Sequence, residues 1–438
     1  MADALKIGIA GLGTVGAALA RILVERKDML TTTCGRAIEI AAVTARDRTR
    51  DRGIDLSGVE WFDDPVAMAE RAGIDVFVEL MGGAGDPAFS AVKAALSRGI
   101  HVVTANKALL AAHGVELATL AEKHGSLLNY EAAVAGGIPV IKALRESLTG
   151  NTISRVYGIM NGTCNYILTK MEKEGLSFAD CLTEAQRLGY AEADPAFDIE
   201  GNDTAHKLSI LTTLAFGTKI AADDIYLEGI TNISIEDIRA AADLGYKIKL
   251  LGIAERTEIG IEQRVHPTFV PKGSAIAGVD GVMNAVALET DHVHELLLAG
   301  PGAGGPPTAS SVLSDILDIG RGTRVPPLGV PSEELLPYKQ APMRAHDGGY
   351  YIRLNAKDVP GALAAIATRM GERGISIDSV IQRSDLGAKA VAPDGSPTRT
   401  VVMITQQTLE SAVRESLAQI AADGFIVGDP QLIRIETL

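Results

Sequence analysis

Short apolar segments alternate with helical patterns over residues 1–130. The four apolar segments have the length and composition of buried strands, and they are LKIGIA at 5–10, IEIAAVT at 38–44, IDVFVEL at 74–80 and HVVTA at 101–105. Helical spacing of apolar residues follows at 14–27, 87–98 and 107–124. Because strands that alternate with helices form parallel sheets, this pattern predicts an α/β domain with a doubly wound sheet.

The pattern changes over residues 131–320. A Gly-rich turn precedes a helix, the segment ISRVYGIM is typical of a strand, and further helices lead to alternating β-type segments between 225 and 300. These features predict an α+β domain, with a return of the chain to the first domain near 300–320 as an open alternative.

The last part of the chain divides in two. Five prolines in residues 321–348 disfavour both helix and sheet, which predicts an extended linker. Residues 349–438 have the βαββαβ spacing of a compact ferredoxin-like domain. Its expected strands are 350–356, 376–382, 400–406 and 430–437, and its expected helices are 361–373 and 409–423.

Composition excludes several classes of function. The net charge of −14 argues against a nucleic-acid partner, since a phosphate backbone would be repelled. The three cysteines form no CxxC pair, which argues against a zinc site and fits a reducing cytosol. We see neither a signal peptide nor an apolar run that could span a membrane, so we expect a cytoplasmic protein.

A glycine-rich turn separates the first strand from the first helix. Its residues are Gly11, Leu12, Gly13, Thr14, Val15 and Gly16, a GxGxxG sequence. In this context Gly11 permits the tight turn, Gly13 lets the backbone approach a pyrophosphate, and Gly16 lets helix and strand pack closely. The turn predicts a Rossmann-type site for a nicotinamide dinucleotide, against the alternative of glycines that serve packing only.

The end of the second strand bears on the choice of cofactor. NAD-specific folds often place an acidic residue there for the ribose hydroxyl. This chain has Arg46 and Arg48, whose guanidinium groups could hold the 2′-phosphate of NADP. The alternative is that both are solvated loop arginines, so NADP is favoured and NAD is not excluded.

Carboxylates and a lysine are concentrated between residues 185 and 207. Asp203 and Lys207 share one face if residues 202–216 are helical, and the apolar residues after Lys207 predict that it is buried. A buried lysine among carboxylates is a candidate for proton transfer, although a solvated ion pair is the plainer alternative. Lys107 follows the fourth strand, at the edge of the sheet where ligands bind, and the alternative is an ordinary surface lysine at the start of a helix.

Together these residues resemble the homoserine dehydrogenase family over about residues 5–320. The family's signature matches at Ala185, Gly189, Tyr190, Ala191, Asp194, Pro195, Asp198, Ile199, Gly201, Asp203 and Lys207. Further family-like segments are GLGTVG at 11–16, TANK at 104–107, YEAAVAGGIPV at 130–140, NGTCNYIL at 161–168 and GPGAGG at 300–305. Cys164 departs slightly from the pattern, where Thr or Ser is more usual.

The resemblance implies an enzyme that interconverts L-homoserine and L-aspartate 4-semialdehyde with NAD(P), in the biosynthesis of threonine, methionine and isoleucine. It makes Lys207 the proton donor, Asp203 the residue that orients it, and Lys107 a contact of substrate and cofactor. It also implies four substrate-binding residues, Glu192 and Asp198 for the ammonium group and Gly162 and Thr163 for the carboxylate, and it places Thr104 and Gly304 near the cofactor.

The resemblance further implies a structural monovalent cation, typically sodium, bound by main-chain oxygens. The matching residues are Glu131, Val134, Gly136 and Ile138. Carbonyl oxygens suit a hard cation, and the sequence has no cluster of His and Cys that would suggest zinc.

The C-terminal domain resembles an ACT domain, in the segments 358–363 and 374–377. Such domains pair their sheets and often bind amino acids, so the resemblance implies L-threonine as an effector and a homodimer or homotetramer. The alternative is a domain that serves dimerisation only. For the whole chain, the alternatives are another amino-acid or semialdehyde dehydrogenase, and a nucleotide-sensing regulator without catalysis.

Overall fold

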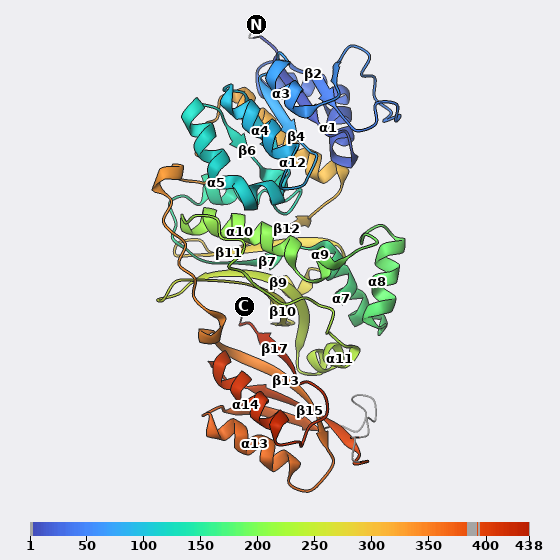
Figure 1. Cartoon of the computed structure of the whole chain (residues 1–438), viewed down its shortest axis with the longest axis vertical. Coiled ribbons are helices and arrows are strands. Elements are labelled where there is room, and N and C mark those ends of the chain that lie inside the picture. The colour runs from blue at the N-terminus through green and yellow to red at the C-terminus, as the bar shows by residue number, and fades with distance from the viewer. Residues whose placement is uncertain (1–2, 383–391, 393–394, 438) are drawn as a thin grey trace.

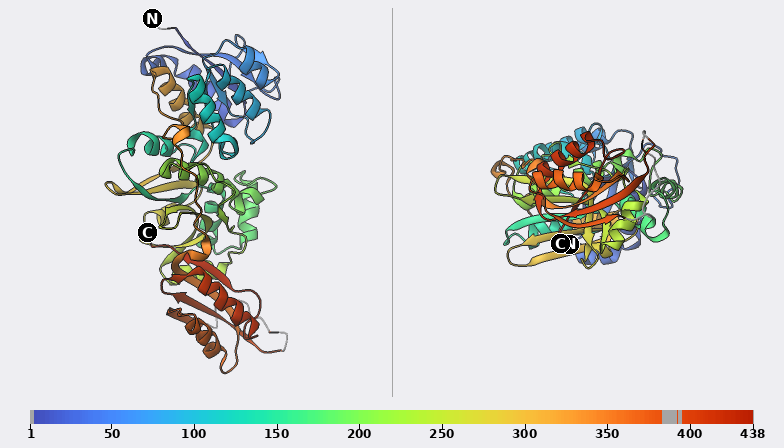
Figure 2. Two further views of the ribbon diagram at one scale, coloured as in Figure 1. Left: turned by 60° about the vertical axis from the view of Figure 1, so that its left-hand side comes forward. Right: turned by 90° about the horizontal axis from the view of Figure 1, so that it is seen from below.

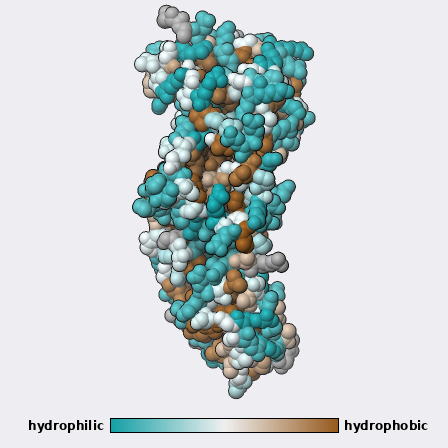
Figure 3. Space-filling model, turned by 90° about the vertical axis from the view of Figure 1, so that its left-hand side faces the viewer, coloured by the Kyte–Doolittle hydropathy of each residue, from teal (hydrophilic) through white to brown (hydrophobic). Residues whose placement is uncertain are grey.

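The computed structural model describes residues 3–382, 392 and 395–437. It is elongated, with the N-terminal part at one end, the C-terminal part at the other and a third part between them (Figures 1 and 2). On the face drawn in Figure 3, apolar side chains are exposed between the N-terminal and the middle part. Within the described ranges, no helix combines the length and the apolar character that crossing a membrane requires.

The N-terminal part contains a six-stranded parallel sheet with the strand order β3-β2-β1-β4-β5-β6. The strands are β1 (Leu5–Ala10), β2 (Ile38–Thr44), β3 (Glu60–Phe62), β4 (Val76–Glu79), β5 (His101–Thr104) and β6 (Leu128–Asn129). This order confirms the predicted doubly wound sheet, and it puts the point where the strand order reverses between β1 and β4. Ligands of such folds bind at that point.

Helices flank this sheet, and one of them comes from late in the chain. They are α1 (Thr14–Glu25), α2 (Lys27–Cys34), α3 (Pro65–Arg71), α4 (Ala88–Ser97), α5 (Lys107–His124) and α12 (Gly305–Arg321). Helix α12 contacts α1, and its Ala309, Val312 and Ile316 are buried in the same core as Ile7 and Leu19. The chain therefore returns to the first sheet after building the middle part.

The middle part is a set of long antiparallel strands covered by helices. The strands are β7 (Ile153–Ile159), β9 (Tyr246–Arg256), β10 (Ile261–Pro271), β11 (Met283–Thr290) and β12 (His294–Pro301). The helices are α7 (Gly162–Glu174), α8 (Phe178–Arg187), α9 (Ala196–Ile199), α10 (Asn202–Phe216) and α11 (Ile235–Asp243). Helix α10 lies between α5 and the strands β7, β9 and β10, and so joins the two parts (Figure 1).

The C-terminal part has the predicted βαββαβ order. Its elements are β13 (Asp347–Lys357), α13 (Ala362–Glu372), β14 (Ile377–Gln382), β15 (Thr398–Thr405), α14 (Glu410–Ala422) and β17 (Gln431–Ile435), with the short β16 (Thr408–Leu409) before α14. Strand β17 pairs in parallel with β10 through Thr268 opposite Arg434 and Phe269 opposite Ile435. The middle and C-terminal strands therefore form one eleven-stranded sheet.

The proline-rich segment contacts first α5 of the N-terminal part, through Ser332 and Glu122, and then the middle part. Leu336 and Gln340 form isolated bridges with Thr218 and Ile261, and Leu335 is buried. The segment that was predicted to be an extended linker contains two short 3-10 helices, Ser332–Glu334 and Met343–Ala345, and packs against the neighbouring parts.

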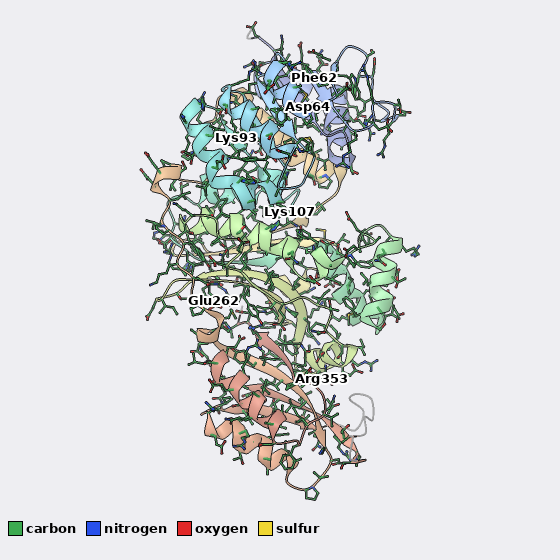
Figure 4. All side chains as sticks on the ribbon, viewed as in Figure 1. Phe62, Asp64, Lys93, Lys107, Glu262 and Arg353 are labelled. Atoms are coloured by element: carbon green, nitrogen blue, oxygen red, sulfur yellow. The ribbon has the colours of Figure 1, made fainter. Side chains whose placement is uncertain are left out.

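Buried ion pairs hold the junction of the middle and C-terminal parts. Arg434 is fully buried; it donates to both carboxylate oxygens of Glu410 within the C-terminal part at 2.7 Å, and across the junction its Nη1 donates to Glu228 Oε2 at 3.0 Å. Arg353, which Figure 4 labels with Glu262 at this junction, donates to Asp237 Oδ1 at 2.7 Å. Replacing one partner of such a buried pair with a neutral residue would leave the other charge uncompensated, at a cost of about 3–5 kcal/mol.

Candidate functional site

A cavity of about 640 Å³ lies between the N-terminal sheet and the middle part. Its lining comes from the turns after β1, β4 and β5, from the start of α7, from α10 and from the turn before α12. Of the predicted site residues, the cavity brings together Val15, Lys107, Gly136, Gly162, Thr163, Asp198, Asp203, Lys207 and Gly304. The site thus opens where the strand order of the first sheet reverses, as expected for this fold.

The glycine turn after β1 has the shape that a dinucleotide requires. Gly11 has a φ of +103°, and a Cβ there would lie 2.6 Å from the Leu80 carbonyl oxygen. A Cβ on Gly16 would lie 1.9 Å from the Gly11 carbonyl, whereas one on Gly13 would meet no atom within 4 Å. No side chain caps α1, so the N–H groups of its first turn are free to bind phosphate.

The arginines after β2 lie outside the cavity lining. Both Arg46 and Arg48 are exposed, and the Arg48 guanidinium lies 5.3 Å from the centre of the Trp61 ring. Arg52 ties their loop to the glycine turn, because its Nε donates to the Leu12 carbonyl at 3.1 Å. The loop therefore lies beside the turn that would hold the pyrophosphate.

Asp203 is shared by two lysines. Its Oδ2 accepts from Lys207 Nζ at 2.8 Å, and its Oδ1 lies 3.1 Å from Lys107 Nζ. Lys207 also donates to the Met160 carbonyl at 2.6 Å. Burial alone would raise the pKa of Asp203, but the two ammonium groups and the donated hydrogen bonds hold it well below its usual value. The residue is therefore a carboxylate that orients both lysines; Figure 4 labels Lys107 between the two parts.

A second carboxylate lies beside this group. Asn161 Nδ2 donates to Asp198 Oδ1 and to Asp203 Oδ2, each at 2.9 Å, and so links the two acids. Burial, followed by the negative charge of Asp203, raises the pKa of Asp198. Thr163 Oγ1 lies 3.2 Å from Asp198 Oδ2 and donates to the Tyr190 carbonyl at 2.7 Å. The start of α7, helix α9 and the loop that contains Tyr190 thus form one polar wall.

Thr104 and Glu192, which were predicted to bind the cofactor and the substrate, also lie outside the cavity lining. Thr104 is fully buried, and its hydroxyl donates to Glu79 Oε2 at 2.6 Å. Glu192 is exposed on the loop between α8 and α9, and its carbonyl accepts from Gln186. Gly189 and Tyr190 of the same loop do line the cavity.

Asn161 and Asn284 also line the cavity, and sequence reasoning gave neither a role. Asn161 is the N-cap of α7 and accepts from Cys164 N, a signal that Asn at a helix start could have supplied. Asn284 is 1% exposed, and its Oδ1 has no hydrogen-bond partner among the described residues. No local pattern marks Asn284, because its position depends on how β11 packs against the turn at Gly302.

The residues predicted to hold a cation form a tight turn next to the cavity. Ala135 and Gly136 both have left-handed backbone angles, with φ of 57° and 55°. The Gly136 carbonyl accepts from Ser311 Oγ, and the Ile138 carbonyl accepts from Val140 N. A carbonyl oxygen has two lone pairs, so both can still coordinate a cation. The described residues contain no group of three or more His, Cys, Asp or Glu that could hold a metal.

Comparison with known proteins follows the division of the chain. Residues 139–317 match the family model described as homoserine dehydrogenase, and residues 11–131 match that of the homoserine dehydrogenase NAD binding domain. Residues 350–421 match the ACT domain model, which confirms the predicted resemblance of the C-terminal part.

Full-length relatives agree with these matches. The homoserine dehydrogenase of Neisseria gonorrhoeae is 44% identical over 99% of each chain. The crystal structure of a homoserine dehydrogenase from Thiobacillus denitrificans has a TM-score of 0.91 and 43% identity, covering 99% of this chain and 98% of that one. A hyperthermophilic archaeal homoserine dehydrogenase in complex with NADPH has a TM-score of 0.63 and 29% identity, covering 74% of this chain and 99% of that one.

The NAD-binding sheet, the cavity with its shared Asp203 and the ACT domain therefore agree with relatives that span the whole length, and the chain belongs to the homoserine dehydrogenase family of NAD(P)-dependent oxidoreductases.

Proposed function

We propose that this homoserine dehydrogenase transfers its proton through Lys207, prefers NADPH, contains a monovalent cation and is inhibited by L-threonine. The observation that carries the first point is the pairing of buried Lys207 with Asp203 at 2.8 Å in the cavity. Each of the other points rests on a separate group of residues and is argued separately below.

Lys207 has one donor left for the substrate. An ammonium group has three N–H donors, and the Met160 carbonyl and Asp203 use two of them. The bound nicotinamide supplies or accepts the hydride. During reduction of the aldehyde, the carbonyl oxygen gains negative charge, which Lys207 stabilises before it gives the oxygen a proton. Solvent then reprotonates the amine, which Asp203 holds in place throughout.

The polar wall beside Lys207 fits the two charged ends of an amino acid. The first N–H groups of α7, at Gly162 and Thr163, are suitable donors for the substrate carboxylate. Asp198 lines the cavity and is a suitable partner for the ammonium group. Glu192 belongs to the loop that also contributes Tyr190 to the lining, so its proposed part in ammonium binding requires that loop to move toward the cavity.

NADPH is the favoured cofactor because a basic loop lies next to the glycine turn. Arg46 and Arg48 follow β2, where the adenosine ribose of a dinucleotide binds in this fold. Arg52 anchors this loop to Leu12 in the glycine turn. A 2′-phosphate is a better partner for two guanidinium groups than a hydroxyl, because it adds charge-assisted hydrogen bonds.

The turn at residues 131–138 is the proposed cation site. The carbonyl oxygens of Glu131, Val134, Gly136 and Ile138 would hold the ion, with Ser311 and Val140 N supporting two of them. A bound cation would stabilise the left-handed turn at Ala135 and Gly136, and Gly136 itself lines the cavity.

The ACT domain is the proposed site of feedback by L-threonine, in an enzyme of threonine, methionine and isoleucine biosynthesis. Gly361 precedes α13 with a φ of 92°, and no side chain caps this helix. Ala362 N donates to the Val359 carbonyl, and the next N–H groups, those of Leu363 and Ala364, are available to an amino-acid carboxylate. Pairing of two ACT domains would complete such a site, so we also propose a homodimer or homotetramer.

Replacing Lys207 with Met should abolish turnover while cofactor binding persists. Loss of the proton donor is expected to lower kcat for L-aspartate 4-semialdehyde by about 10²- to 10⁴-fold. The rate is followed by loss of NADPH absorbance, and cofactor binding by NADPH fluorescence. Lys93→Met, which removes a surface lysine paired with Glu116, is the control and should keep its activity. Activity that survives Lys207→Met would contradict the assignment.

Replacing both Arg46 and Arg48 with Ala should weaken NADPH and spare NADH. Each hydrogen bond to a charged group contributes about 1.5–3 kcal/mol, so KM for NADPH is expected to rise about tenfold or more. Steady-state kinetics with both cofactors measure the change, with Arg373→Ala in the ACT domain as the control. Equal changes in KM for NADPH and for NADH would show that the two arginines do not bind the 2′-phosphate.

Removing monovalent cations should reduce both stability and activity. Protein dialysed into a tetramethylammonium buffer is expected to unfold at a lower temperature than protein in sodium at equal ionic strength, because a ligand that binds only the folded state stabilises it. At a sodium concentration of about 100 times Kd the stabilisation is about 2.7 kcal/mol. Identical unfolding midpoints in the two buffers would argue against the site.

L-threonine should inhibit the wild-type enzyme, and Leu363→Asp should relieve the inhibition. Leu363 is 40% exposed in the first turn of α13, so a carboxylate there would repel that of the ligand. A tenfold rise in the inhibition constant corresponds to about 1.4 kcal/mol. Leu409→Asp, at the exposed start of α14, is the matched control. Inhibition that is the same in all three proteins would exclude this end of α13.

A further inference from the structure

Glu79, the last residue of β4, has a fully buried carboxylate that the reaction described above does not use. We propose that Glu79 is a positioning residue for the dehydrogenase reaction. It fixes two of the loops that line the cavity, and through one of them it sets the place of Lys107. Two separate arms of hydrogen bonds carry this role, one from each carboxylate oxygen.

The first arm holds the loop after β4. Glu79 Oε1 accepts from Met81 N at 2.7 Å and from Gly82 N at 3.1 Å. Met81 and Gly82 line the cavity, together with Leu80, whose carbonyl packs against Gly11 of the glycine turn. The N–H groups of Met81 and Gly82 both point away from the cavity, toward the Glu79 carboxylate behind the loop. These two hydrogen bonds fix the surface of the loop that faces the cofactor.

The second arm holds the turn between β5 and α5. Thr104 Oγ1 donates to Glu79 Oε2 at 2.6 Å and accepts from Asn106 N at 3.0 Å. Asn106 Oδ1 caps α5 by accepting from Leu109 N, and Asn106 Nδ2 donates to the Gly83 carbonyl at 2.7 Å. The second arm therefore returns to the loop that the first arm holds, and the hydrogen bonds form a closed ring.

Lys107 depends on this ring because it follows Asn106 and is the first residue of α5. Its Nζ lies 3.1 Å from Asp203 Oδ1 at the reacting centre. A displacement of about 1 Å at a catalytic group can cost about 10²-fold in rate. Loss of the second arm would free the turn and let the Lys107 ammonium move relative to Asp203.

A role in packing alone does not explain Glu79, because a buried carboxylate destabilises the protein more than an apolar side chain of the same volume would. Burial penalises a carboxylate unless hydrogen bonds compensate it, and Glu79 accepts three. A neutral residue could fill the same volume but could not accept from Met81 N, Gly82 N and the Thr104 hydroxyl together. The ionised group is needed for the simultaneous hold on both loops.

Glu79→Gln separates the two arms. The amide oxygen can still accept from Met81 N and Gly82 N, whereas the amide NH₂ can only donate to Thr104 Oγ1, which leaves the buried hydroxyl proton without its acceptor. We therefore expect kcat to fall about tenfold or more, with the dissociation constant of NADPH changed by less than about twofold. Thr104→Val removes the same arm from the other side and should have the same effect, while Thr104→Ser, which keeps the hydroxyl, should recover most of the rate.

The test uses the full-length enzyme with NADPH and L-aspartate 4-semialdehyde. We would measure kcat, KM, NADPH affinity by fluorescence and the thermal unfolding midpoint for each variant and for Glu79→Gln combined with Thr104→Val. Glu116→Gln is the control, since Glu116 is an exposed residue of α5 that pairs with Lys93. Because both substitutions break one arm, the double variant should lose no more activity than the more impaired single variant.

Three results would overturn the proposal. One is a kcat of Glu79→Gln within about twofold of the wild type. The second is a loss of activity that is fully explained by a smaller fraction of folded protein. The third is a double variant whose loss of kcat equals the product of the losses in the two single variants. If Glu79→Gln does not fold, the proposal is tested by comparing kcat of Thr104→Val with kcat of Thr104→Ser. Equal values would show that the Thr104 hydroxyl has no role in positioning.

Discussion

The site depends on one carboxylate that two parts of the molecule share. Asp203 and Lys207 belong to α10 of the middle part, whereas Lys107 belongs to α5 of the NAD-binding part. A buried carboxylate is stable only with compensating charge, and Asp203 has two ammonium groups and Asn161 around it. Moving the NAD-binding part away would remove one of these cations. The ion pairs of Asp203 with Lys107 and Lys207 therefore determine the distance between the two walls of the cavity, α5 and α10.

Small residues let α10 reach this position. Gly201, at the N-cap of α10, has a φ of 92°, and a Cβ there would lie 2.9 Å from the Val265 side chain. A Cβ on Gly252 of β9 would lie 2.8 Å from Thr204. The start of the helix thus lies directly on the sheet. This close approach brings Lys207 within reach of the Met160 carbonyl, which orients its ammonium toward the cavity.

Local patterns predicted much of the fold and of the acidic segment, but not the contacts between distant segments. The spacing of Asp203 and Lys207 indicated a shared helical face, and the position of Lys107 after β5 indicated the ligand edge of the sheet. The contact between Lys107 and Asp203 depends on the packing of two parts, which no local spacing records. Glu79 is similar: at the end of an apolar strand it has no polar neighbour in sequence that would mark its partner Thr104.

Side-chain hydrogen bonds, in addition to the pairing of β10 with β17, connect the ACT domain to the catalytic sheet. Arg434 of β17 donates to Glu228 Oε2 at 3.0 Å, and Glu228 N donates to the Val265 carbonyl. Two residues further on, Ile230 N donates to the carbonyl of Ile199, the neighbour of Asp198. The same guanidinium donates to Glu410 of α14 within the ACT domain, so Arg434 links α14 and β17 to Glu228 of the middle part. Hydrogen bonds therefore connect β17, through Glu228 and the backbone of residues 228–230, to the segment that contains Asp198.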